Sequence, residues 1–152
     1  MEQRRARKLR KTTFSALVML MIAACASSSG SAGSGPALVG QNWVAEEISR
    51  RGVLDNVQST MSIDATGRAT GLGGCNSYGG PARINGDAIR FGPLATTRMA
   101  CTPAVGDQEQ RFFAALASAT RFGFTPEGKL VLYDANGAVV VTFGRLIGQQ
   151  QP

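Results

Sequence analysis

Histidine is absent from all 152 residues. This absence excludes Ser-His-Asp and Cys-His catalysis and any metal site that depends on imidazole ligands. After the N-terminal segment the chain contains a single lysine, Lys129, which lies beside a turn glycine. A Ser-Lys catalytic pair is therefore not expected. Glu46 and Glu47 are adjacent on a predicted strand, so their side chains point to opposite faces and do not form an acid/base pair.

Residues 1–24 carry +5 of the net charge of +6, and the rest of the chain carries +1. Residues 1–24 contain six of the 16 basic residues and one of the ten acidic residues. The remainder is nearly neutral, which argues against binding to nucleic acid. The whole chain is 43% hydrophobic, which is enough apolar material for the core of one domain.

The first 24 residues have the organisation of an export signal. A basic stretch at 4–11 precedes an apolar run at 14–24, which is shorter than the roughly 20 residues needed to span a bilayer. The sequence Ile22-Ala23-Ala24-Cys25 resembles the bacterial lipobox, although Ile22 stands where leucine is commonest. The resemblance implies cleavage before Cys25 and a diacylglyceryl thioether on its sulfur. An ordinary signal peptide with an incidental cysteine is the alternative.

Residues 25–36 are predicted to be the lipid-modified Cys25 followed by a flexible tether. Residues 26–36 are serine, glycine and alanine with one proline, and such a coil spans roughly 18 Å. Ala26 replaces the aspartate that retains lipoproteins in the inner membrane, so the expected location is the outer membrane, facing the periplasm. Residues 148–152 are predicted to be a frayed tail.

Residues 37–147 are predicted to form one α+β domain, a small antiparallel β-sheet or barrel-like fold packed with one main helix. Closely spaced glycines separate short strands, predicted at 43–48, 57–63 and 120–124. Asn85-Gly86 is the predicted turn of a hairpin. Asp107 is the predicted helix N-cap, with Gln110 completing a capping box.

The last hairpin allows its register to be predicted. A two-residue turn at 136–137 pairs Leu132 with Val141 and Leu130 with Phe143, all on one face. The opposite face contains Val131, Tyr133 and Val140 and is more apolar than a solvated face should be. Either another element covers these three residues, which is the commoner case, or they form a surface that binds a partner.

Two cysteines remain after Cys25 is assigned to the lipid. In an exported protein, Cys75 and Cys101 are expected to form a disulfide, with two separate buried thiols as the alternative. Without histidine they make a poor zinc site, and no metal is expected. The glycine-rich segment 71–76 lacks the third glycine and the βαβ context of a nucleotide loop.

Several segments resemble the META domain family, which includes HslJ-like heat-shock lipoproteins. The segments are Trp43; Gly74, Asn76 and Tyr78 within 73–79; Thr97, Arg98 and Met99 within 97–101; Glu109 with 112–116; and 130–134 with Gly137 and Phe143. The resemblance covers about residues 38–146. It implies antiparallel strands wrapped around one helix, a link to envelope and heat-shock stress responses, and no catalytic residues that can be transferred.

The predicted function is a non-enzymatic binding or stabilising module of the cell envelope, anchored through Cys25 and without a cofactor. Its partner would be an envelope protein or peptide. One alternative is an enzyme or enzyme inhibitor with a polar site near Arg98 and Asn76, although a structural role for Arg98 is favoured. Another is a purely structural envelope domain.

Overall fold

The computed structural model describes residues 37–146. The predicted signal peptide, Cys25, the tether and the tail lie outside the described residues. The elements are β1 (Asn42–Ile48), β2 (Arg51–Gly52), β3 (Thr60–Ile63), β4 (Arg68–Leu72), β5 (Ser77–Asn85), β6 (Ala88–Phe91), β7 (Ala95–Thr96), α1 (Pro103–Ser118), β8 (Arg121–Phe124), β9 (Leu130–Tyr133) and β10 (Val139–Arg145).

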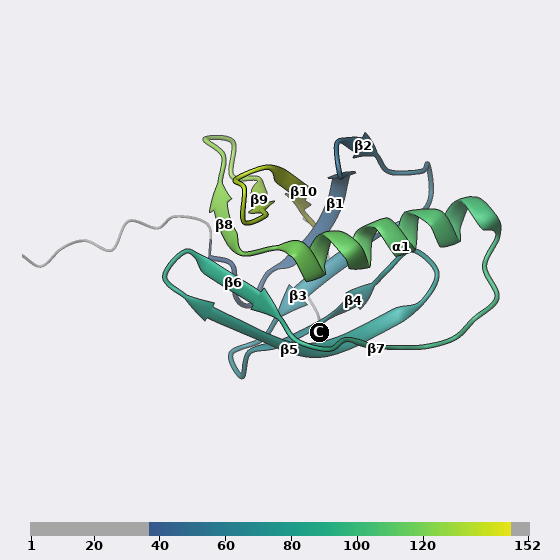
Figure 1. Ribbon diagram of the computed structural model, residues 1–152, viewed down its shortest axis with the longest axis horizontal. Coiled ribbons are helices and arrows are strands. Elements are labelled where there is room, and N and C mark those ends of the chain that lie inside the picture. The colour runs from purple at the N-terminus through teal and green to yellow at the C-terminus, as the bar shows by residue number, and fades with distance from the viewer. Residues whose placement is uncertain (1–36, 147–152) are drawn as a thin grey trace, which may run out of the picture. The chain divides into compact units, whose positions relative to one another are not determined.

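The strands form one antiparallel sheet that closes on itself. Their order is β10-β9-β8-β6-β5-β4-β3-β1-β2, and β10 also pairs with β1 (Figure 1). The joint between β6 and β8 is the weakest, because it rests on the single pair Ala88 and Arg121. The α+β class and the arrangement of strands around one helix are confirmed.

Helix α1 lies across the inner face of this sheet and contacts β1, β6 and β10 (Figure 1). Phe112 and Leu116 are fully buried on its inner side. The predicted N-cap at Asp107 is wrong, since the helix begins four residues earlier at Pro103 with Thr102 as its N-cap. Proline suits the first helical position because its φ is already helical and its missing N–H is not needed there.

The register of the β9–β10 hairpin is confirmed along most of its length. Leu132 faces Val141 and Leu130 faces Phe143, and all four side chains are fully buried. Near the turn the register differs from the prediction by one residue, with a bulge between Val139 and Val141. The turn is three residues long, because the Asp134 N–H donates to the Ala138 carbonyl. Gly137 lies within it at φ +80°.

The β5–β6 hairpin is also present, but its turn is displaced by one residue. Asn85 pairs with Ala88, which leaves Gly86 and Asp87 at the centre instead of Asn85 and Gly86. Gly86 has φ +60°, the conformation that favours glycine at the first central position. Strand β3 begins at Thr60, three residues after the predicted start.

The core lies entirely within the described domain. Its buried apolar residues run from Leu38 to Phe143. Within residues 37–146, every buried side-chain nitrogen and oxygen has a hydrogen-bond partner. In the part of the chain that the structure describes, no helix is long and apolar enough to cross a membrane.

Candidate functional site

The segment between β4 and β5 is held against the first half of α1 by one carboxylate. Glu109 Oε2 accepts hydrogen bonds from the backbone N–H groups of Cys75, at 3.0 Å, and Asn76, at 2.6 Å. Glu109 Oε1 accepts a third from Asn76 Nδ2 at 2.8 Å. This carboxylate therefore fixes a turn that belongs to no regular element.

Asn76 extends the same network to the loop that precedes the helix. Its Oδ1 accepts hydrogen bonds from Thr97 Oγ1 at 2.9 Å and from the Met99 N–H at 2.7 Å. Its Nδ2 also donates to Cys101 Sγ at 3.5 Å. A side-chain amide can make four hydrogen bonds, so all of this group's capacity is used inside the protein.

A disulfide joins the same two segments. Cys75 and Cys101 are bonded, with their Cα atoms 6.1 Å apart, within the range usual for disulfides. The covalent link and the Asn76 hydrogen bonds therefore fix the 97–101 loop at Met99 and at Cys101.

The glycines before Cys75 allow this close packing. A Cβ on Gly73 would lie 2.6 Å from Phe113 Cζ and 2.8 Å from Glu109 Cγ. Gly74 has φ +145°, a conformation that other residues rarely adopt. The pair thus forms a tight turn against the helix and not a phosphate loop.

A second buried polar residue on α1 holds the 53–59 loop. Gln108 is fully buried, and its Oε1 accepts a hydrogen bond from the Leu54 N–H at 2.7 Å. Its Nε2 donates to Val57 O and Ser59 Oγ, and Ser59 Oγ donates to Gly73 O. The sequence reasoning did not identify Gln108, although its position four residues before Phe112 places a polar residue on the core face of the helix.

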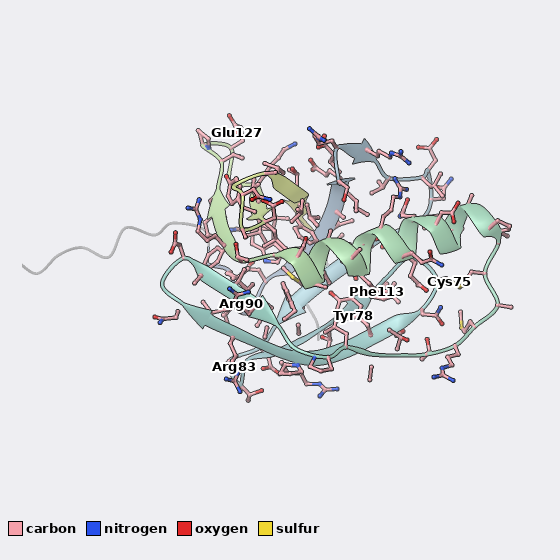
Figure 2. The ribbon with its side chains drawn as sticks, in the orientation of Figure 1. Cys75, Tyr78, Arg83, Arg90, Phe113 and Glu127 are labelled. Atoms are coloured by element: carbon pink, nitrogen blue, oxygen red, sulfur yellow. A yellow bond between two sulfur atoms is a disulfide. The ribbon has the colours of Figure 1, made fainter. Side chains whose placement is uncertain are left out.

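The electrostatics agree with a structural role for these groups. Burial raises the pKa of Glu109, but the hydrogen bonds from Asn76 and Cys75 outweigh this and leave it below the usual value. Burial raises the pKa of Tyr78, whose hydroxyl donates to Thr60 O. Tyr78 also packs edge-to-face on Phe113 at 5.4 Å, beneath the helix (Figure 2).

The other predicted motif residues fall into two groups. Trp43 is fully buried in β1, and its Nε1 donates to Leu38 O at 3.2 Å. Arg98 and Met99 lie instead at the surface of the 97–101 loop, where 61% of Met99 is exposed. The structure thus brings segments 73–79 and 97–101 together, while the side chains of Arg98 and Met99 remain exposed.

The three residues considered as a partner surface do not form one exposed patch. Val131 is buried, and Val140 packs against the core next to the β10 bulge. Tyr133 is half-buried, with the guanidinium of Arg121 5.6 Å from its ring centre. At Val140 the bulge between Val139 and Val141 shifts the register, so that Tyr133 pairs with Val139.

Other candidate chemistry is also accounted for. Lys129 Nζ lies 2.6 Å from Glu46 Oε2, so the lysine is already engaged in an ion pair, and that contact raises its pKa. Among residues 37–146, no three His, Cys, Asp or Glu side chains cluster as a metal site would require.

Comparison with known proteins agrees with this picture. A solution structure of a protein from Burkholderia xenovorans is 30% identical, with a TM-score of 0.60, and the match covers 73% of this chain and 85% of that one. A second solution structure, at 21% identity and a TM-score of 0.55, covers 70% of this chain and 89% of the other and shares the fold. No curated protein matches the sequence. Residues 36–146 match the META domain, and the chain therefore belongs to the META domain family.

Proposed function

We propose that this META domain protein is a bacterial envelope lipoprotein, anchored through Cys25, that binds or stabilises an envelope protein or peptide without catalysing a reaction. The lipobox-like sequence before Cys25 and the Ser/Gly-rich residues 26–36 support the anchor. Ala26 supports the outer membrane, facing the periplasm. The family resemblance supports a role in heat-shock and envelope stress.

The observation that carries the binding function is the set of four hydrogen bonds made by Asn76. An active site near Arg98 and Asn76 would need polar groups free to meet a substrate. Asn76 is only 6% exposed, and its side chain bonds to Thr97, Met99, Glu109 and Cys101. These bonds favour binding over catalysis, because the polar groups of Asn76 are already used to position the 97–101 loop.

The loop so positioned is suited to contact a partner. The Met99 side chain is largely exposed, whereas its backbone N–H donates a hydrogen bond to Asn76. Two residues later, Cys101 is held by the disulfide. A methionine on a fixed backbone offers an adaptable apolar contact without the entropic cost of ordering the backbone. The exposed Arg98 beside it adds a charged group.

Two substitutions test the anchor and the contact separately. Cys25→Ala is expected to move the protein from the membrane fraction to the soluble fraction or to leave unprocessed precursor. Equal recovery of mature wild type and variant in membranes would refute the anchor. Met99→Asp is expected to abolish chemical crosslinks to envelope proteins, whereas Val39→Asp, which alters a residue 38% exposed at the other end of the domain, keeps them.

Crosslinks that persist unchanged in Met99→Asp would exclude this loop as the contact. If neither the wild type nor Val39→Asp gives crosslinks, the purely structural envelope domain becomes the better description. The stress role is tested by comparing growth at raised temperature of cells with and without the chain, and equal growth would contradict it.

A further inference from the structure

Two arginines stand directly opposite each other on the outer face of the β5–β6 hairpin. Arg83 pairs with Arg90 in the register of the strands, and both side chains are exposed. Like charges in this position repel each other and destabilise a sheet. Among the described residues, neither arginine forms an ion pair, since the two ion pairs found are Arg121 with Asp87 and Lys129 with Glu46.

Neighbouring strands add positive charge to the same face. Arg68 of β4 pairs with Pro81, and Arg121 of β8 pairs with Ala88, and both arginines are exposed. We define the arginine face as Arg68, Arg83, Arg90 and Arg121.

Two carboxylates flank the arginine face, and neither forms an ion pair with Arg83 or Arg90. Asp64 Oδ1 accepts hydrogen bonds from its own turn, from Thr66 and from the Arg68 N–H. Asp87 lies 3.9 Å from Arg121. Arg83 and Arg90 therefore remain available for an anionic partner.

The chain enters the domain at the same end of the sheet. The Gly40 N–H donates to Ile63 O, the last residue before the β3–β4 turn. The Ala82 N–H donates to Gly67 O in that turn, next to Arg83. The first residues of the domain and the arginine face thus lie at one end of the molecule, while Cys75 lies at the other (Figure 2).

We propose that the arginine face docks on the anionic lipid headgroups of the membrane that holds the anchor. This inference rests on the proposed lipid at Cys25, because only residues 26–36 separate that anchor from the domain. Eleven residues reach at most about 40 Å when fully extended, so the first residues of the domain stay within about that distance of the bilayer surface. Guanidinium groups suit this partner because they bind phosphate oxygens in pairs.

The tether explains why so few charges suffice. An anchored domain meets the surface at a high effective concentration, so weak docking is well populated. The 97–101 loop follows β7 and bonds to Ser77, at the end of β5 opposite Arg83. Docking through the arginine face would therefore leave the proposed contact at Met99 free to meet a partner.

The test reproduces the anchor chemically. The chain 25–152, with its disulfide intact, is coupled through the Cys25 thiol to a maleimide lipid in nanodiscs that contain a gadolinium-chelating lipid. Amide signals are then compared in phosphatidylcholine discs with and without phosphatidylglycerol. We expect the 83–90 amides to broaden far more than those of 97–100, and only in the anionic discs.

Matched variants assign the effect to the arginine face. R83Q/R90Q is expected to lower the docking equilibrium by at least about tenfold. R50Q/R51Q removes the same charge from the exposed residues Arg50, in the turn after β1, and Arg51, in β2, and is expected to behave as wild type. Wild-type broadening should also vanish when ionic strength rises from about 0.01 M to about 1 M, which tests docking without any substitution.

Equal broadening in neutral and anionic discs, or no change in R83Q/R90Q, would overturn the proposal. So would broadening that persists at high ionic strength. Because the lipid is coupled to Cys25 chemically, these outcomes do not depend on lipidation in the cell. A failure of the docking proposal can therefore be distinguished from a failure of the proposed lipid anchor.

Discussion

Asn76 and Glu109 hold each other at two points across a sequence separation of 33 residues. The Asn76 N–H donates to Glu109 Oε2 at 2.6 Å, and its Nδ2 donates to Oε1 at 2.8 Å. The first bond fixes the turn before β5, and the second orients the amide whose oxygen holds the 97–101 loop. Glu109 is therefore a positioning residue for the exposed part of the motif, although it touches none of that part itself.

Glu109→Ala is expected to destabilise the domain by about 3 kcal/mol, because it leaves the part-buried N–H of Cys75 and the buried N–H of Asn76 without an acceptor. Urea denaturation measures the change. Glu127→Ala, in the exposed turn after β8, serves as the control and should change stability by less than about 0.5 kcal/mol. Similar losses in both variants would show that the Glu109 network contributes nothing special.

The lowered pKa of Glu109 predicts the direction of a pH effect. A carboxyl whose pKa is lower in the folded state stabilises the protein above its unfolded pKa, and this contribution is lost as pH falls through the folded value. Stability should therefore decline below about pH 4.5. Glu109→Gln should flatten this part of the curve, and an unchanged slope in that variant would assign the decline to other carboxyls.

The sequence was informative wherever the structure depends on local pattern. Alternation in 130–143 predicted which side chains of β9 and β10 face the core, because a one-residue slip would expose Leu132 and Val141. The β5–β6 turn lies one residue later than predicted, and the β9–β10 turn has three residues instead of two. Turn types and bulges depend on the φ and ψ angles of single residues, which the alternation of apolar and polar residues does not specify. The pairing of β1 with β10 could not be predicted, because it joins the two ends of the domain.

The family motif was recognised from the sequence, but the contacts that its residues make were not. Asn76, Thr97 and Met99 were identified, but their convergence on Glu109 depends on how the helix lies across the sheet. The incorrect N-cap at Asp107 also hid the role of Glu109. A helix that starts there has Glu109 in its first turn, where the helix dipole alone explains an acidic residue.

The Cys75–Cys101 disulfide is expected to stabilise the fold without being required for it. On the chain-entropy model, a loop of about 27 residues contributes roughly 3.5 kcal/mol. Reduction, or the double variant C75S/C101S, should lower the thermal midpoint while leaving the circular dichroism spectrum unchanged at room temperature. The core from Leu38 to Phe143 supports this expectation. A reduced protein that unfolds at once would show that the core alone is insufficient.

Two glycine substitutions should change stability in opposite directions. Gly73→Ala places a methyl group 2.6 Å from Phe113 Cζ and 2.8 Å from Glu109 Cγ, and we expect a loss of about 1–3 kcal/mol. Gly106→Ala is the matched control, because its Cβ meets nothing within 4 Å and the residue lies inside α1. Alanine there should raise stability by up to about 1 kcal/mol, since glycine costs more backbone entropy in a helix. Combining Gly73→Ala with Phe113→Leu should recover part of the loss, and strictly additive effects would show that the methyl group does not press on this ring.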